Sequence, residues 1–170
     1  MSTSVTLNNL SFDKIHAASA TLAQCWKSAY KGLVNDEYLL SLKNTHWTES
    51  LEKNIDNQTS NCIIAEENGR IIGVSIFGKS ITEKYPDDGE ITSLYVIPEF
   101  IGRSIGRMLF EKAELLIKEQ GYHNCITCAF AENSKAIGFY NAHGYEIVSR
   151  NEIVKMGVQE LQYVIMRKAL

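Results

Sequence analysis

The stretch from Glu90 to Ile117, EITSLYVIPEFIGRSIGRMLFEKAELLI, decides the fold of this chain. It begins with strand-forming residues, and this run ends at Pro98 because proline cannot extend a sheet ladder. A loop spaced by Gly102 and Gly106 follows, and from Ile105 apolar residues recur at three- and four-residue steps, the pattern of one helix face. The order of strand, turn, glycine-spaced loop and helix predicts a site for a phosphorylated ligand.

The chemistry of this loop favours an anion. The first turn of a helix has backbone N–H groups without intrahelical partners, and the helix dipole adds positive potential there. Arg103 and Arg107 bring two positive charges to the same place. Loop flexibility is the other interpretation of such glycine spacing. The sequence contains neither G-x-x-x-x-G-K-[ST] nor G-x-G-x-x-G with an acidic residue downstream, so it favours neither a P-loop protein nor a Rossmann dehydrogenase.

Three blocks of this sequence resemble the GNAT N-acetyltransferase superfamily. The segment 101–106, IGRSIG, resembles the family motif Q/R-x-x-G-x-G/A, and 94–99, LYVIPE, is similar to its L-Y-V-x-P-E strand. The block 133–145, NSKAIGFYNAHGY, resembles N-x-x-A-x-x-F-Y-x-x-x-G-F. Two positions depart from the pattern: Ile101 stands where Gln or Arg is usual, and Ser104 stands where the first glycine is usual. Because any residue supplies a backbone amide, we expect cofactor binding to persist.

The resemblance implies an α/β (α+β) architecture, the GNAT acyltransferase fold. This fold has a mixed central sheet of about seven strands, helices on both faces and a V-shaped splay between the fourth and fifth strands. The resemblance also implies acetyl-CoA as co-substrate, and we expect no metal. The cofactor-binding residues that it implies are Leu94, Tyr95, Val96, Ile101, Gly102, Arg103, Ser104, Ile105, Gly106, Arg107, Asn133 and Tyr140.

Periodicity predicts the other elements. Strands are expected at 5–10, 62–65, 71–77, 125–130, 145–150 and 159–166, and Asn68-Gly69 is the expected turn of a hairpin. Helices are expected at 15–30 and 134–142, with a shorter helical pattern within 38–51. We therefore expect a single N-acetyltransferase domain over residues 1–170.

Composition narrows the class of partner. A net charge of −3 gives no large basic surface, which argues against nucleic acid. No apolar run approaches the ~20 residues that span a bilayer, and the first residues lack the pattern of a secretory signal, so we expect no membrane partner and a cytoplasmic location. The four cysteines should be free. Cys125 and Cys128 would point to opposite faces of a strand, which argues against a metal site.

Acetyl transfer needs a base, and Glu90 is the first candidate. It opens the predicted fourth strand, where several family members carry a glutamate base. Alternation puts it on one face with Leu94 and Val96 if no bulge intervenes, and it would act through water. A plain surface charge at a strand end is the other interpretation, and Asp88 and Glu83 are weaker candidates for the base.

The resemblance assigns the remaining catalytic roles. Tyr140 would stabilise the departing thiolate, although a buried core tyrosine is the alternative. The backbone N–H of Val96 would polarise the thioester carbonyl, and Leu94 and Val96 would pair with the pantetheine arm. Asn133 would bind the same arm or cap the helix that it precedes.

The acceptor is less constrained by the sequence. An acidic cluster (Glu83, Asp87, Asp88 and Glu90) would attract a cationic amine at a pocket mouth, or is a solvated turn. Aromatic residues of the first helical segments could line the pocket or form core: Trp26, Tyr30, Tyr38 and Trp47.

We predict an N-acetyltransferase in which a primary amine attacks acetyl-CoA directly in a ternary complex. A small amine or polyamine is the favoured acceptor, and a peptide N-terminus or lysine is the second. An acyl-CoA-binding regulatory module without turnover is the alternative from another class. The last strand offers a pairing edge for a homodimer.

Overall fold

The structure, a computed structural model, describes residues 4–57 and 60–170. The strands are β1 (Thr6–Asn9), β2 (Ser60–Glu67), β3 (Arg70–Lys79), β4 (Gly89–Val96), β5 (Asn124–Phe130), β6 (Glu146–Met156) and β7 (Gln159–Ala169). The helices are α1 (Ile15–Ala29), α2 (Asp36–Ser41), α3 (Thr48–Asn57), α4 (Ile105–Glu119) and α5 (Ser134–Ala142), with 3-10 turns η1 (Phe12–Lys14) and η2 (Pro98–Phe100). The strands form one seven-stranded sheet in the order β1-β2-β3-β4-β5-β7-β6, which confirms the expected mixed sheet.

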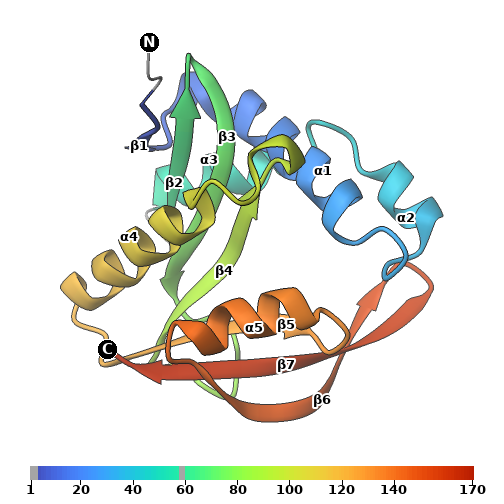
Figure 1. Cartoon of the computed structure of the whole chain (residues 1–170), viewed down its shortest axis with the longest axis vertical. Helices are drawn as coiled ribbons and strands as arrows, with labels where there is room; N and C mark the ends of the chain where they lie inside the picture. Colours follow the sequence, from blue (N-terminus) through green and yellow to red (C-terminus); the bar gives the residue numbers. More distant parts are fainter. Residues whose placement is uncertain (1–3, 58–59) are drawn as a thin grey trace.

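β4 and β5 are parallel and separate soon after they meet. Three residue pairs join them: Gly89 with Cys125, Glu90 with Ile126, and Ile91 with Thr127. β4 nevertheless continues to Val96 and β5 to Phe130. In Figure 1, β2, β3 and β4 rise steeply, whereas β5, β7 and β6 cross the lower half of the molecule. The two halves of the sheet therefore diverge, and the expected V-shaped splay is confirmed.

Helices cover both faces of the sheet, as expected. One apolar cluster joins α4 and α5 to the sheet through Leu109, Phe110 and Tyr140. A second cluster packs α1 and α3 against the opposite face of β2 and β3, with Leu22 and Leu51 fully buried. Burying both faces is what the near-continuous apolar runs of β2 and β3 require.

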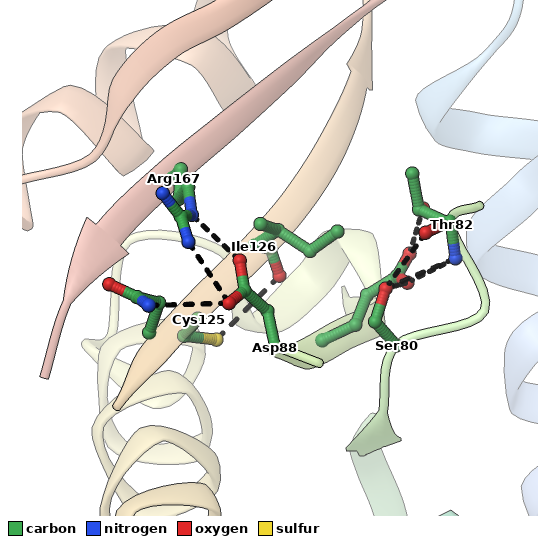
Figure 2. A network of polar contacts seen from close by, with 8 residues as sticks. Ser80, Thr82, Asp88, Cys125, Ile126 and Arg167 are labelled. Atoms are coloured by element: carbon green, nitrogen blue, oxygen red, sulfur yellow. Dashed lines mark hydrogen bonds and ion pairs between the residues drawn. The ribbon is translucent and has the colours of Figure 1, made fainter. Parts of the chain in front are cut away.

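At the narrow end of the V, the buried Asp88 forms an ion pair with the partly exposed Arg167 of β7. The Arg167 Nε donates to Asp88 Oδ2 at 2.7 Å and its Nη2 donates to Oδ1 at 3.1 Å, as Figure 2 shows. The Asn124 amide donates to the same carboxylate at 3.3 Å. Asp88 is 5% exposed, and it holds β4 to β7 across the start of β5.

Two features differ from the expectations. The last strand, β7, lies between β5 and β6, so it is not a free edge, and the expected dimer edge on it is wrong. The edge strand is β6, which also runs beyond the expected end at residue 150 to Met156. It passes through Asn151, whose φ of 62° places a non-glycine residue in the left-handed region. The predicted Asn68-Gly69 turn is confirmed, with φ of 53° and 76°.

We predict that Gly89→Ala destabilises the protein. A Cβ on Gly89 would lie 2.2 Å from Cγ2 of Ile117 in α4 and 3.4 Å from Tyr122 Cγ, and neither neighbour can withdraw freely from a packed core. Overpacking of this kind costs about 1–3 kcal/mol, which lowers the melting temperature by roughly 2–10 °C for a domain of this size. Thermal unfolding followed by circular dichroism measures this shift.

Gly138→Ala in α5 is the matched control, because a Cβ there meets nothing within 4 Å. Alanine is the better helix former by about 1 kcal/mol, so this variant should melt at the same temperature or slightly higher. Equal melting temperatures for both variants would contradict the tight contact between β4 and α4.

Candidate active site

The glycine-spaced loop leads into the N-terminus of α4, as predicted. Gly102 has a φ of 88°, and Ser104, at the N-cap position, has a φ of 63°. The Ser104 side chain makes no capping hydrogen bond, so serine here does not act as a side-chain cap. A Cβ on Gly106 would lie 3.7 Å from Val96 Cγ2. The start of α4 therefore lies next to the end of β4, with its first N–H groups available for an anion.

The two arginines of this loop already have acidic partners. The Arg103 Nη2 donates to Glu67 Oε1 at 2.6 Å, and the Arg107 Nε donates to Glu111 Oε1 at 2.7 Å. The Arg103 guanidinium also lies over the Phe100 ring, 4.6 Å from its centroid. A phosphate at α4 would compete with these carboxylates, so the positive charge predicted here is partly neutralised within the protein.

The other residues of the predicted cofactor set divide by their burial. Ile105 is 1% exposed and belongs to the core, so it offers a ligand its backbone rather than its side chain. Ile101 is 68% exposed at the end of η2. Asn133 caps α5, because its Oδ1 accepts from the Ala136 N–H at 3.2 Å, and the predicted capping role is confirmed.

A bulge in β4 changes which side chains share a face. Ile91 pairs with Phe77 of β3, whereas Ser93 pairs with the adjacent Ile76, so Thr92 is the additional residue. Tyr95 consequently turns toward α1, where its hydroxyl lies 2.8 Å from that of Tyr30.

Glu90 and Tyr95 are five residues apart and would face opposite sides of a regular strand, yet both line one cavity. Leu94 and Val96 instead pack into the cluster around α4. The expectation that Glu90 shares a face with Leu94 and Val96 is therefore wrong, because the bulge intervenes.

Beyond the bulge, the backbone of β4 faces the splay. The Ile97 N–H donates to Ile72 O at 2.9 Å, toward β3. Because successive N–H groups of a strand point to alternate edges, those of Leu94 and Val96 turn away from β3. On that side β5 has already diverged. The gap thus presents backbone groups that an extended ligand can pair with, and the pairing of these two residues with a pantetheine arm stays a prediction.

A cavity of 130 Å³ occupies the splay, and Tyr140 lines it together with residues of both strands. Tyr140 is 8% exposed. Burial raises the pKa of its phenol to about 12, an effect that the Thr127 side chain partly offsets. Tyr140 therefore stays protonated at neutral pH and can donate a hydrogen bond to an anion that forms in this cavity.

A second cavity, of 590 Å³, lies beside the splay. Strands β5, β7 and β6 form its floor, α1 contributes Trp26 and its C-cap residue Tyr30, and the connection between β3 and β4 forms a wall. Trp26 and Tyr30 thus reach the cavity, whereas Tyr38 and Trp47 do not line it, although they pack in the same apolar cluster as these two residues. Five residues line both cavities: Tyr30, Thr92, Tyr95, Cys128 and Ala129. The two cavities therefore adjoin at the opening of the V.

Glu90 lines the larger cavity and anchors its wall. It is 4% exposed, and its Oε2 accepts from the Ser80 hydroxyl and from the N–H groups of Ile81 and Thr82, at 2.9–3.1 Å. Its Oε1 accepts from the Thr82 hydroxyl at 3.1 Å. Figure 2 shows Ser80 and Thr82 at one end of this polar region and the Asp88–Arg167 pair at the other. Asp88 does not line the cavity, whereas Glu83 does.

The described cysteines are free, and Cys128 is the one that lines both cavities. Burial raises the pKa of its thiol to about 12, so the nucleophilic thiolate is scarce at neutral pH. Within residues 4–57 and 60–170, no three His, Cys, Asp or Glu side chains gather closely enough to hold a metal ion.

Comparison with known proteins identifies the family. The model of the acetyltransferase (GNAT) family matches residues 24–145. This range includes the five residues that line both cavities and the loop that leads into α4. The chain belongs to the GNAT family. It is thus an acyltransferase, and the resemblance of the three sequence blocks is confirmed.

Individual relatives agree with this assignment. A spermidine N(1)-acetyltransferase of Thermoplasma acidophilum is 28% identical over 145 residues, which cover 85% of this chain and 89% of that protein. The crystal structure of PaiA N-acetyltransferase from Thermoplasma acidophilum in complex with coenzyme A has a TM-score of 0.77 at 23% identity, covering 98% of this chain and 99% of that one. A ribosomal-protein-alanine N-acetyltransferase from Brucella melitensis has a TM-score of 0.75 at 22% identity, covering 97% and 99%. The two structural likenesses establish the shared fold.

Sequence reasoning named Tyr30 and Tyr95 but missed their contact, and it missed Lys84 and Glu152 of this GNAT site. The hydroxyl pair of Tyr30 and Tyr95 depends on the β4 bulge, which has no evident signal in the sequence. Glu152 and Lys84 form an ion pair in the lining of the larger cavity, and they lie in segments that do not resemble family motifs. Among the described helices, none has the length and apolar character to cross a bilayer.

We predict that Ser104→Gly stabilises this GNAT protein. The left-handed conformation costs a residue with a Cβ roughly 1–2 kcal/mol. Glycine avoids that cost, but it loses more conformational entropy on folding, which offsets about 0.5–1 kcal/mol of the gain. The melting temperature should therefore rise by a few degrees, as scanning calorimetry would record. Ser104→Val is the contrasting variant and should melt lower, because a β-branched residue tolerates positive φ poorly. A lower melting temperature for Ser104→Gly would contradict the strained backbone.

We predict that Glu90→Gln weakens the fold. The new amide nitrogen cannot accept the hydrogen bonds that a carboxylate oxygen accepts from the 80–82 segment, and buried donors left unsatisfied cost about 1–3 kcal/mol. Urea unfolding measures the loss. Glu83→Gln is the matched control, since Glu83 is exposed and such changes stay within about 0.5 kcal/mol. Equal stability of the two variants would show that Glu90 does not anchor the wall.

Proposed function

We propose that this GNAT acetyltransferase transfers the acetyl group of acetyl-CoA to a primary amine by direct attack within a ternary complex, with a small amine or polyamine as the favoured acceptor. The observation that carries the proposal is the adjoining of the two cavities at five shared residues. A thioester held in the splay would face an amine held in the larger cavity. No covalent relay between the two is needed.

Acetyl-CoA would bind along β4 and against α4. Its pantetheine amides would pair with the outward backbone groups of Leu94 and Val96, and its pyrophosphate would accept from the first N–H groups of α4. The likeness in fold to a GNAT protein in complex with coenzyme A supports this placement. The exchange of Arg103 from Glu67 to the pyrophosphate would complete the site, because a guanidinium forms paired hydrogen bonds with either group.

The acceptor must lose a proton before it attacks. An alkylamine with a pKa near 10.4 is protonated at pH 7, so exposing its lone pair costs about 4–5 kcal/mol. Glu90 would receive that proton through water at Oε1, which accepts one protein hydrogen bond among the described residues, whereas Oε2 accepts three. Glu90 can anchor the wall and act as base at once, because it anchors the wall mainly through Oε2 and would receive the proton at Oε1.

The thioester would be polarised and its sulfur stabilised by groups of the splay. The Val96 N–H would donate to the carbonyl oxygen as negative charge develops there, an interaction worth a few kcal/mol. Tyr140 would donate a hydrogen bond to the leaving thiolate. Proton transfer from a phenol of pKa about 12 to a thiolate near 8.5 is uphill by about 5 kcal/mol, so Tyr140 acts as a donor and keeps its proton.

The larger cavity has the character of a cationic alkylamine site. Its floor is mostly apolar, with Val154, Met156 and Ile165, and rings of Trp26 and Tyr163 line it. Aromatic faces attract ammonium groups as well as methylenes. The sequence similarity to a spermidine N(1)-acetyltransferase supports the same class of acceptor.

We predict that Tyr140→Phe lowers kcat by roughly ten- to a hundredfold, as loss of one hydrogen bond to a charged group implies, while the Kd for acetyl-CoA changes little. The assay is release of the coenzyme A thiol from acetyl-CoA against polyamines, amino acids, aminoglycosides and peptides with free N-termini. Release with the amines and not with the peptides would support the proposed acceptor class, and the reverse would favour the peptide alternative. Binding of acetyl-CoA without release for any acceptor would turn the assignment toward a regulatory module.

The same preparation tests direct attack. Cys128→Ala should retain acetyl transfer, and intact-mass analysis of the wild type mixed with acetyl-CoA alone should find no added acetyl group on the protein. An acetylated protein that loses its acetyl group when an amine is added would overturn the direct mechanism and replace it by a covalent one.

A further inference from the structure

The wall and the floor of the acceptor cavity are joined by one ion pair. Lys84, in the connection between β3 and β4, donates from Nζ to Glu152 Oε1 on β6. The same ammonium donates to the Ser149 hydroxyl at 3.3 Å, and that hydroxyl donates to Glu152 Oε1 at 2.5 Å. An alkylammonium of the protein is thus bound inside the cavity in which an alkylammonium of the acceptor is expected.

The sheet is distorted where Glu152 enters the cavity. Ser149 pairs with Ile165 and Glu152 pairs with Tyr163, so three steps along β6 oppose two along β7. The additional residue is accommodated by Asn151 in the left-handed conformation. In a regular strand Ser149 and Glu152 would point to opposite faces, whereas here they share one hydrogen bond. The bulge thereby turns Glu152 onto the floor, where it is the charged residue among Val154, Met156 and Ile165.

Strand registers give the distance from Glu152 to the opening of the V. Phe130 of β5 pairs with Tyr163 of β7, which pairs with Glu152 of β6. Two strand spacings of about 4.8 Å place the backbone of Glu152 roughly 10 Å from the backbone of Phe130. Phe130 directly follows Ala129, one of the residues shared by the two cavities. An extended chain of methylenes over the apolar floor spans that distance.

The pair between Lys84 and Glu152 is suited to exchange. The Lys84 side chain is 56% exposed and that of Glu152 is 18% exposed, and ion pairs this close to solvent contribute little to stability. Replacing one ammonium by another on the same carboxylate preserves the charge balance, and the displaced Lys84 returns to water. The ammonium of Lys84 also lowers the pKa of Glu152, so the carboxylate is ionised at neutral pH.

We propose that Glu152 is the distal ammonium site of the acceptor cavity and that Lys84 occupies it in the free protein. The enzyme would then select acceptors with a second ammonium roughly 10 Å from the reacting nitrogen, because such acceptors displace Lys84. This inference rests on the proposed function. It adds Glu152 as a residue that determines acceptor specificity and Lys84 as an internal competitor of the acceptor. No bond is made or broken in the exchange.

The test compares three acceptors in the wild type, Lys84→Met and Glu152→Gln. The acceptors are the eight-carbon diamine, whose nitrogens match the expected spacing, the eight-carbon monoamine, and the four-carbon diamine, which is too short. Lys84→Met should lower the KM of the long diamine about two- to fivefold, because a competing ion pair has been removed. Glu152→Gln should raise that KM about tenfold. The ratio of kcat/KM for long diamine over monoamine should rise in the first variant and fall toward one in the second.

Lys53→Met is the matched control, because Lys53 forms an exposed ion pair with Glu49 on α3 that does not line the cavity. It should leave all three KM values unchanged. A diamine-to-monoamine ratio that is the same in the wild type, Lys84→Met and Glu152→Gln would overturn the inference. So would equal discrimination for the long and the short diamine.

Binding without turnover separates this inference from the proposed function. Titration calorimetry of the long diamine into protein saturated with coenzyme A gives a Kd that should fall in Lys84→Met and rise in Glu152→Gln. These shifts without any acetyl transfer would sustain the distal site and refute the proposed reaction. Acetyl transfer with no difference in Kd between the variants would refute the distal site alone.

Discussion

The site depends on the brevity of the contact between β4 and β5. Three residue pairs join the two strands, and beyond them both strands continue but no longer pair with each other. The divergence leaves a gap in the middle of the sheet, which a sheet tolerates only if its narrow end is secured. The paired hydrogen bonds between Asp88 and Arg167 provide that security, because removing Arg167 would take the charged partner from a carboxylate that is 5% exposed. Both cavities, and the residues that they share, follow from this geometry.

How much of this could be predicted from sequence differs along the chain. The strand at 94–97, the loop to Gly106 and the helix from Ile105 carry strong local signals, since proline, glycine spacing and apolar periodicity each act within a few residues. Those elements, and with them the position of the predicted anion site, follow directly. The splay itself was expected from the family resemblance, because no local rule reports how far two parallel strands run together.

The features that sequence reasoning could not supply are the register changes. Because Thr92 is an additional residue in β4, Glu90 and Leu94 lie on opposite faces of that strand. The additional residue near Asn151 in β6 likewise changes the face of Glu152 relative to Ser149. A bulge depends on pairing with a neighbouring strand, and that pairing is a property of the assembled sheet. The place of β7 inside the sheet is of the same kind, because chain order alone does not distinguish an inner strand from an edge.

The charged groups around the site share a second property, which is that the protein provides their counterions. Glu67 and Glu111 pair with the arginines of the loop and first turn of α4, and Lys84 pairs with Glu152 in the lining of the larger cavity. Ligands of matching charge would take over these partners by exchange, so their net gain is smaller than that of binding to a bare charge. These internal ion pairs also orient the charged side chains of the site and weaken the electrostatic field at its surface.

The splay is also an edge enclosed within the sheet. An exposed strand edge ordinarily invites pairing with other chains, and proteins protect such edges with charges, bulges or covering elements. Here the unpaired backbone of Leu94 and Val96 is flanked by β3 and β5, and the space beside it is 130 Å³. A slender, unbranched molecule with amide groups, such as the proposed pantetheine arm, would suit such a slot better than a polypeptide strand with side chains. The strands on either side would thus limit pairing with other chains, while this edge stays available to the proposed ligand.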